Sequence, residues 1–471
     1  MFYQVKYRLT KPAYKPYDAS PFKINDSVFK ICPIGKYSCL RDEMFSFLNL
    51  EHAFEGWNFT ENGMLWAYNQ NYFDWINQTS FAKEEGCKWI DKFIEELPCH
   101  KVGLDPYPTA LRSINWVKFF SNYPDCATET RLNSLYSQLK LLEKKLEYHL
   151  LGNHLLEDAY ALYIGAAFFN DGQMLIKASK LLRTQLAEQV LPDGAHFEQS
   201  PMYHCILLDR LLDCINIKPE SELVDFATKM LGHLESIVWS DNTIPLMNDA
   251  ANGIAPPPEQ IFDYARRLGL RWEAIPLKES GYRKMTSEAM EAIVDVGNIT
   301  ATYQPGHTHA DTFNYELRID GKPFVVDTGI STYNKTERRQ LERSTKAHNC
   351  IVVDGRNSSE VWGGFRVGKR ANVEIAGQAR NEVAACHDGF GKPCKRRFEM
   401  TEKGFTIEDW YDGEAVSYVH LAEDADEHRV SVEGAISIDV KPWQYSVKYN
   451  EFLNGKVMVI RFNNHIKYTI R

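Results

Sequence analysis

Several features that define common protein classes are missing from this sequence of 471 residues. Its 10 cysteines stand at irregular spacings without a CxxC pair, so we expect reduced structural thiols and no zinc ribbon or redox motif. No run reaches the roughly 20 apolar residues that a membrane-spanning helix requires. The first residues contain no apolar segment typical of a signal peptide, and we therefore expect a cytoplasmic protein unless a signal was removed.

The sequence also lacks an excess of basic residues. Its 54 Lys+Arg stand against 63 Asp+Glu, which gives a net charge of -9 and a pI near 5.9. This balance argues against a nucleic-acid-binding protein whose whole surface is basic, so an anionic partner would have to meet a local patch. The length and the 44% of hydrophobic residues predict a globular protein of several domains with at least one large core.

The spacing of apolar residues changes once along the chain. From about residue 40 to 285 it is helical, as in the stripe from Leu132 to Leu146. Afterwards it alternates, as in Asn314–Ile319, where Asp320-Gly321 predicts a hairpin turn and Pro323–Val326 the return strand. Helices followed by strands predict a multidomain α and β protein. We expect an N-terminal extension over 1–39, a helical domain over 40–285 and an antiparallel sheet domain over 286–471.

The densest group of candidate catalytic residues is the segment Gly306–Asp311. In an extended chain, side chains at i, i+2 and i+4 share one face, so His307, His309 and Asp311 would point the same way. One of these histidines together with Asp327 and His348 would make a two-histidine, one-carboxylate site that suits zinc. Simpler interpretations are a surface histidine pair, a turn-capping Asp327 and a buried, hydrogen-bonded His348.

Two polar islands interrupt the apolar sequence of the helical half. Asn153-His154 lies between leucine pairs, and His196-Phe197-Glu198 precedes Ser200-Pro201, which predicts an N-cap and a proline at the first helical position. Tyr203 then falls in the first turn, where the helix dipole favours a phenolate and where a proton-transferring tyrosine would be useful. The alternative is that Tyr203 simply packs on a neighbouring element.

Basic residues are in local excess between Asn334 and Arg370, where nine Lys and Arg stand against four acidic residues. Such a stretch beside the histidines indicates a binding site for an anionic substrate, and a solvated charge run is the alternative. The candidate contacts are Arg338, Arg339, Arg343, Arg366 and Arg370.

Five ordered segments together resemble the heparinase II/III-like polysaccharide lyases. They are Asn153-His154, Asp193–His204, His307–Gly329, Arg343–Gly355 and Phe365–Ala371. The resemblance covers about residues 40–430 and implies an incomplete α/α toroid followed by an antiparallel β-sandwich. It also implies β-elimination at a uronic acid of an anionic polysaccharide or oligosaccharide: a base removes the C5 proton, the C4–O4 bond breaks, and a C4–C5 double bond remains.

The resemblance implies a role for each matching residue. Asn153 corresponds to the residue that neutralises the uronate carboxylate. Tyr203 corresponds to the tyrosine that protonates the leaving oxygen and that in some geometries also takes the C5 proton, and His307 corresponds to the histidine base needed when that proton lies on the opposite face from the leaving group. Substrate contacts are implied for His154, His196, Glu198 and Tyr315. A zinc site found in some relatives corresponds to His309, Asp327 and His348, and its place beside His307 suggests a structural role.

Two other functions stay open at this point. The segment His307–Asp311 resembles the HxHxDH motif of metallo-β-lactamase-type hydrolases, although Thr312 stands where the last histidine belongs and that fold does not open with a long helical half. The other is a non-catalytic polysaccharide-binding protein on a lyase scaffold. Trp57-Asn58 and Leu65–Trp75 are similar to relatives thought to act in bacterial polysaccharide assembly. The sequence names neither the sugar nor an oligomeric state.

Overall fold

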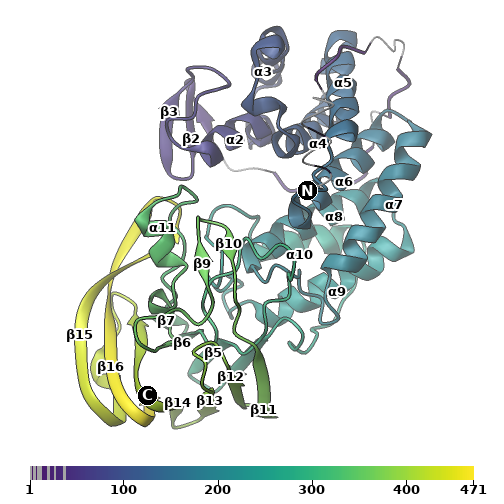
Figure 1. The fold of residues 1–471 in the computed structure, drawn as a ribbon. Coiled ribbons are helices and arrows are strands. Elements are labelled where there is room, and N and C mark those ends of the chain that lie inside the picture. The colour runs from purple at the N-terminus through teal and green to yellow at the C-terminus, as the bar shows by residue number, and fades with distance from the viewer. Residues whose placement is uncertain (1–2, 4–6, 8–12, 18–21, 26–27, 36–38) are drawn as a thin grey trace. The chain divides into compact units, whose positions relative to one another are not determined.

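Helices α2 (Met64–Tyr72) to α10 (Pro258–Arg267) precede the large antiparallel sheet along the chain, as the change of period predicts (Figure 1). The structure is a computed structural model that describes residues 3, 7, 13–17, 22–25, 28–35 and 39–471, so much of the expected N-terminal extension lies outside the described residues. The chain divides into two units. The helical unit comprises residues 1–189, 206–228 and 260–271, and the sheet unit comprises 190–205, 229–259 and 272–471.

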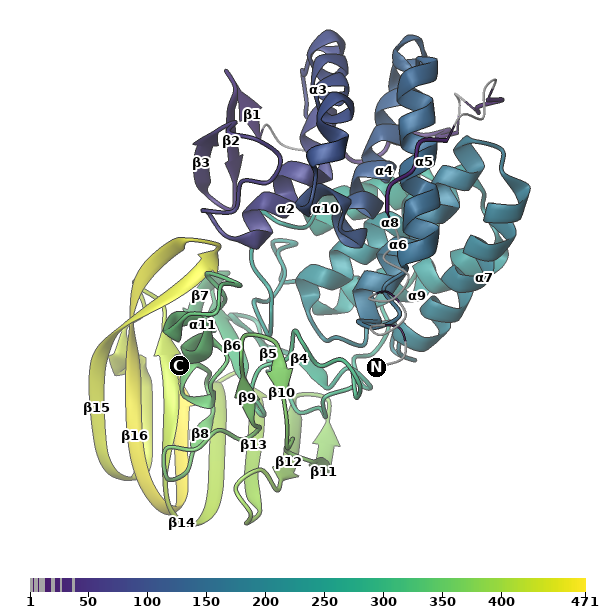
Figure 2. The same ribbon diagram turned by 45° about the horizontal axis from the view of Figure 1, so that its top comes forward.

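The helical unit is made of apolar and amphipathic helices packed on one another (Figure 2). Its helices are α2 (Met64–Tyr72), α3 (Lys83–Glu96), α4 (Pro106–Asn122), α5 (Glu129–Lys145), α6 (Gly152–Phe168) and α7 (Gly172–Gln189). Three more, α8 (Pro201–Ile217), α9 (Ser221–Ile237) and α10 (Pro258–Arg267), pass from one unit to the other. Helix α4 contacts α2, α5 and α6, and α6 contacts α7. In the described part of the chain, no helix is both long and apolar enough to cross a membrane.

A small antiparallel sheet precedes the first of these helices, where the sequence predicted helix. It consists of β1 (Leu40–Arg41), β2 (Met44–Phe47) and β3 (Leu50–Ala53). Two tight turns join the strands, and all four turn residues, Asp42-Glu43 and Leu48-Asn49, have positive φ values between 48° and 62°. Positive φ at both central residues is the geometry of a two-residue hairpin, which corrects the helical prediction for residues 40–53.

The sheet unit contains an antiparallel sheet of 11 strands, in which β14 pairs with both β13 and β16. The strands are β4 (Tyr282–Thr286), β5 (Met290–Asp295), β6 (Tyr315–Ile319), β7 (Lys322–Val325), β8 (Ile351–Val352), β11 (Val373–Ala379), β12 (Glu382–His387), β13 (Cys394–Thr401), β14 (Gly404–Leu421), β15 (Val430–Lys448) and β16 (Glu451–Ile470). The hairpin predicted at Asp320-Gly321 joins β6 to β7, and both turn residues have positive φ.

The long strands let this sheet close over its own core. The register of β14 and β16 shifts between Tyr411 and Glu414, and such a bulge bends a strand. Tyr315 of β6 packs on Phe398 and Phe405, with ring centroids 5.6 and 5.7 Å apart, although β6 does not pair with their strands. Side chains from separate parts of the sheet therefore meet face to face, as in a sandwich.

Candidate active site

The first turn of α8 is tied to the loop that follows α9. Ser200 caps α8, because its Oγ accepts a hydrogen bond from the backbone N–H of Tyr203 at 3.3 Å. The same hydroxyl donates to the backbone carbonyl of Asp249 at 2.6 Å. Gln199 and Asn248, which directly precede Ser200 and Asp249 in the chain, have positive φ values of 56° and 57°. The capping residue predicted from sequence thus also fixes where Tyr203 lies against Asp249.

Asp249 lies at the centre of a buried group that we call the Asp249 cluster, with Arg339, His307 and His309. Arg339 donates to both carboxylate oxygens, at 2.5 and 2.7 Å. His307 Nδ1 lies 2.9 Å from Oδ2, and His309 Nε2 lies 2.8 Å from Oδ1. Burial by itself would raise the pKa of the Asp249 carboxyl, but Arg339 and the two histidines together hold it well below its usual range.

The contact with Asp249 decides which nitrogen of His307 can accept a proton. A histidine whose Nδ1–H donates to a carboxylate carries its lone pair on Nε2. His307 Nε2 lies 3.8 Å from a carboxylate oxygen of Glu198, which would stabilise the positive charge that the ring acquires as a base. His307 is 8% exposed, so little water screens these charges.

The ring of Tyr203 packs against that of His307 at a tilt of 33°. Their ring centroids are 4.0 Å apart, and the Tyr203 hydroxyl lies 3.3 Å from that of Tyr333, whose oxygen is 3.5 Å from His307 Nδ1. Burial raises the pKa of Tyr203 well above its usual value. This corrects the expectation of a phenolate favoured by the helix dipole: the hydroxyl is protonated at neutral pH and can donate a proton.

A second buried array joins His348 and Asp327. His348 Nδ1 lies 2.7 Å from Asp327 Oδ2, which also accepts from the Asn314 amide at 2.5 Å, and Oδ1 accepts from the Gly329 N–H at 2.7 Å. Burial lowers the pKa of His348, but the Asp327 carboxylate outweighs that effect and the net change is upward.

The predicted zinc ligands do not converge in this arrangement. The rings of His309 and His348 are 5.2 Å apart, while His309 Nε2 is taken up by Asp249. Among the residues that the structure describes, no three His, Cys, Asp or Glu side chains are placed to hold a metal ion together. One ring nitrogen of each histidine is thus engaged by a carboxylate, His309 Nε2 by Asp249 and His348 Nδ1 by Asp327, and the chemistry proposed for this site uses no metal.

Asn153 and His154 lie at the start of α6 in the helical unit. Asn153 is buried, and His154 Nδ1 lies 2.9 Å from a carboxylate oxygen of Glu147 while its ring packs on Tyr107. The residue that precedes this helix, Leu151, has φ 62°, a conformation that is rare for a bulky side chain. Backbone strain of this kind is typical of functional segments.

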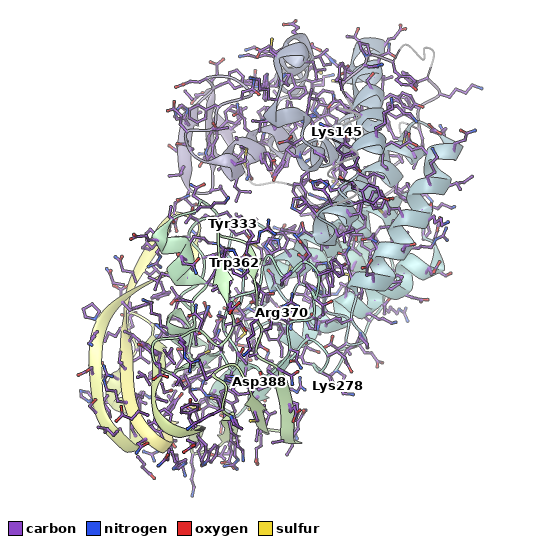
Figure 3. All side chains as sticks on the ribbon, in the orientation of Figure 1. Lys145, Lys278, Tyr333, Trp362, Arg370 and Asp388 are labelled. Atoms are coloured by element: carbon purple, nitrogen blue, oxygen red, sulfur yellow. The ribbon has the colours of Figure 1, made fainter. Side chains whose placement is uncertain are left out.

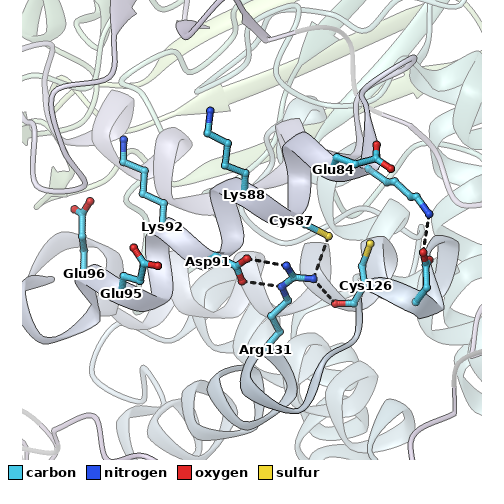
Figure 4. Close-up of a pocket in the computed structure, with 11 residues that line it drawn as sticks. Glu84, Cys87, Lys88, Asp91, Lys92, Glu95, Glu96, Cys126 and Arg131 are labelled. Carbon is cyan, nitrogen blue, oxygen red and sulfur yellow. Dashed lines mark hydrogen bonds and ion pairs between the residues drawn. The ribbon is translucent and has the colours of Figure 1, made fainter.

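A pocket in the helical unit has a different character. It lies along α3 and is lined by side chains of both charges (Figure 4). Arg131 pairs with the Asp91 carboxylate at 2.7 Å and donates to the Cys87 sulfur at 3.1 Å. All ten cysteines are free thiols, as expected. None of the predicted site residues lines this pocket, so we assign it no part in the chemistry.

Sequence models of one family match both parts of the chain. The heparinase II/III N-terminus matches residues 112–254, and the heparinase II/III-like C-terminal domain matches residues 270–465. The chain belongs to the heparinase II/III family. This family membership argues against the metallo-β-lactamase-type hydrolase, which has a different fold.

Individual relatives agree with this family. A heparin-sulfate lyase of Pedobacter heparinus is 27% identical over 262 residues, which are 48% of this chain and 39% of that protein, so the match spans about two-fifths of the relative. The crystal structure of heparinase III superposes with a TM-score of 0.66 and 14% identity over 99% of this chain and 88% of that one. The crystal structure of a mutant heparan sulfate lyase from Pedobacter heparinus superposes with a TM-score of 0.61 and 16% identity, over 100% of this chain and 87% of that one. At these identities the structures establish the expected fold, a helical toroid followed by a β-sandwich.

The structure separates the predicted arginines of this heparinase-family chain into two groups. Arg339 and Arg343 are fully buried, and Arg343 donates to the backbone carbonyls of Thr308 and Arg366. This corrects their prediction as exposed substrate contacts, because a guanidinium bonded to buried acceptors is withheld from solvent. Arg366 is exposed, Arg370 is half-buried, and Arg338 is partly exposed beside Glu342 at 2.7 Å.

Tyr315 also requires a correction. Its side chain is fully buried in the sandwich core, and its hydroxyl lies 3.4 Å from that of Tyr468. A side chain enclosed in this way does not line a binding surface, so the predicted substrate contact is wrong. His196 and Glu198 lie in the segment before α8. Both are buried, Glu198 faces His307, and burial lowers the pKa of His196 to about 4.

Sequence reasoning missed two members of this site, Asp249 and Tyr333. Asp249 lies in an otherwise apolar and small-residue loop, Leu246–Gly253, where an Asn-Asp pair was the available signal. Tyr333 lies in the loop before α11 (Glu337–Glu342), and no local pattern distinguishes it.

Proposed function

We propose that this protein is a polysaccharide lyase that cleaves a uronic-acid-containing anionic polysaccharide by β-elimination. One observation carries the proposal: a protonated Tyr203 packs on His307, and Asp249 holds His307 with Nε2 as the basic nitrogen. An acid and a base in contact, each biased toward its own role by its surroundings, are what an elimination requires.

His307 Nε2 takes the proton from C5 of the uronate ring. The electrons of the C5–H bond form the C4–C5 double bond, the C4–O4 bond breaks, and Tyr203 gives its proton to O4. Glu198 stabilises the imidazolium that forms, at 3.8 Å in the resting site. Proton exchange with solvent then restores both side chains.

The substrate carboxylate must be neutralised before C5 becomes acidic enough. Negative charge develops beside that carboxylate as the proton leaves, so a contact that strengthens with the charge lowers the barrier. We assign this role to Asn153 on the basis of the family resemblance. The polymer chain would meet the accessible basic residues Arg338, Arg366 and Arg370, with the partly exposed His154 as a further contact. His196 is buried and is not among them.

The test is incubation with a panel of uronate polymers, including heparan sulfate, while the ultraviolet absorbance of the unsaturated product is followed. Tyr203→Phe keeps the ring that packs on His307 and removes only the proton donor, so turnover should fall by about 10²- to 10⁴-fold. Tyr418→Phe is the matched control, because Tyr418 is also partly buried in the sheet unit and near a histidine, His420. Wild-type turnover in Tyr203→Phe would exclude this role. Binding of the polymers without any product would favour the non-catalytic alternative.

Zinc held by His309, Asp327 and His348 stays a proposal. It is supported by one buried nitrogen, Nδ1 of His309, which has no hydrogen-bond partner among the described residues. Buried polar atoms of this kind are costly unless something binds them. Protein purified without chelator should contain about one zinc per chain, and His348→Ala should lower both zinc content and thermal stability. Metal-free protein with unchanged stability would leave the array as a purely hydrogen-bonded one.

A further inference from the structure

A short hairpin in the sheet unit carries exposed aromatic and basic side chains. Its strands β9 (Val361–Trp362) and β10 (Arg366–Val367) pair in antiparallel fashion, and the turn between them contains Gly363 and Gly364 at φ 59° and 83°. Trp362 is 50% exposed (Figure 3) and Phe365 is 37% exposed. Arg366 is also exposed. Large aromatic side chains left in water beside an active site are typical of a binding surface.

Buried arginines hold this hairpin against the Asp249 cluster. Arg339 donates through Nε and Nη2 to the Gly364 carbonyl at 3.2 and 3.0 Å while it pairs with Asp249. Arg343 donates to the Arg366 carbonyl at 3.3 Å and to the Thr308 carbonyl, next to His307, at 2.8 Å. Arg339 and Arg343, which the sequence suggested as substrate contacts, therefore support the hairpin. The side chains that the hairpin exposes to solvent are those of Trp362, Phe365 and Arg366.

The two aromatic rings of the hairpin lie at different distances from the chemistry. Phe365 is in edge contact with His307 and Tyr333, with centroids 6.1 and 5.1 Å apart. Trp362 packs on the backbone of Gly368: a Cβ added there would lie 2.9 Å from a carbon of the indole ring. Part of the indole is thus fixed by the hairpin and the rest is open to solvent.

Sugar rings and aromatic rings are complementary surfaces. The axial C–H groups of a pyranose carry partial positive charge, and the faces of aromatic rings are negative and apolar. An acidic polymer adds carboxylate or sulfate groups that a guanidinium binds through paired hydrogen bonds. We propose that the β9–β10 hairpin is a subsite for acidic sugar rings, in which Trp362 and Phe365 stack on pyranose faces and Arg366 binds the acidic group. The inference deepens the proposed lyase function and rests on it for the class of ligand.

Binding in a Tyr203→Phe background separates this subsite from catalysis, because the polymer stays intact. The probes are heparan sulfate and its carboxyl-reduced form, with affinity measured by calorimetry. Trp362→Ala and Phe365→Ala should each weaken binding of both probes by about tenfold. Arg366→Ala should weaken binding of heparan sulfate more than that of the reduced polymer. Ile436→Ala, which removes a 63% exposed side chain from β15, should change neither.

Gly368→Ala tests the position of Trp362 without deleting it. The added methyl group meets the ends of two movable side chains, Trp362 and Glu360, so the fold should tolerate it while the indole is displaced. We expect weaker binding with an unchanged melting temperature. Wild-type affinity in Trp362→Ala, Phe365→Ala and Gly368→Ala would overturn the subsite even if Tyr203→Phe abolishes cleavage. Conversely, loss of affinity in these variants of a protein that cleaves no polymer would leave the subsite standing and refute the lyase.

Discussion

The two units each bury a cluster of charges, and the two clusters are built in opposite ways. In the sheet unit, the single carboxylate of Asp249 is surrounded by a guanidinium and two imidazoles. In the helical unit, the Arg210 cluster places Glu157, Asp209 and Asp213 around Arg210, with Lys118 on Asp213 at 2.6 Å. Carboxylates outnumber cations there.

The hydrogen bonds reflect this difference in composition. Both oxygens of Asp249 are bonded, whereas neither oxygen of Glu157 has a hydrogen-bond partner among the described residues, and Arg210 Nε is 3.8 Å away. Burial, opposed in part by Arg210, raises the pKa of Glu157 to about 7, whereas the pKa of Asp249 is lowered. Burial is nearly complete in both cases, so the number of donors around a carboxylate decides the direction of its pKa.

The largest expected effect is the loss of the Asp249 charge. Asp249→Asn leaves Arg339 buried without its anion and should lower the free energy of unfolding by about 3–5 kcal/mol in urea titrations. Asp388→Asn is the control, because Asp388 is exposed in the same unit (Figure 3). Equal stabilities of the two variants would show that the Asp249 cluster contributes nothing net.

Removing the Glu157 carboxylate from the helical unit should raise the free energy of unfolding at neutral pH, whereas removing the Asp249 charge lowers it. The pKa of the Glu157 carboxyl is 4.5 in the unfolded chain and about 7 in the fold, so the folded state holds more protons between these values. The stability contribution is complete below pH 4.5 and is lost as the pH rises through 7. Each tenfold difference in proton affinity between the folded and unfolded chains corresponds to about 1.4 kcal/mol.

Glu157→Gln removes this titration. Its stability relative to the wild type should rise between pH 4.5 and 7 and then level off, as measured by urea unfolding at several pH values. Glu188→Gln on α7, an exposed glutamate of the same unit, should give a flat difference. A flat difference for Glu157→Gln as well would mean that Glu157 ionises normally inside the fold.

The smallest effect concerns charges that remain in water. Affinity for a uronate polymer should weaken with added salt, and Arg366→Ala or Arg370→Ala should each reduce affinity a few-fold and flatten the salt dependence, because exposed charges are screened over roughly 8 Å at 0.15 M. Arg397→Ala, on β13 and paired with Glu382 at 2.8 Å, is the control. A salt dependence that neither variant alters would show that the two arginines do not meet the polymer.

Local sequence determined the parts of this protein that depend on neighbours along the chain. The change of apolar period predicts helices before strands, Asp320-Gly321 predicts the β6–β7 turn, and Ser200-Pro201 predicts the start of α8. Each is an interaction within a few residues, so the composition of the segment is enough. Local sequence also singled out His307 and Tyr203, and the family resemblance assigned them the roles of base and acid. The fold brings the two side chains into contact.

Only the tertiary structure decided which charges face water and which face each other. Arg338 and Arg339 are neighbours in α11, but successive helical residues point about 100° apart, so one lies at the surface and the other reaches Asp249. Asp249 is 58 residues from His307 in the chain, and no local pattern encodes that contact. The strand that contains Tyr315 shows the expected alternation of apolar and polar residues. The face of the strand that carries Tyr315 is nevertheless in the core, because Phe398 and Phe405 cover it. Sequence periodicity states which residues share a face, and packing decides what that face meets.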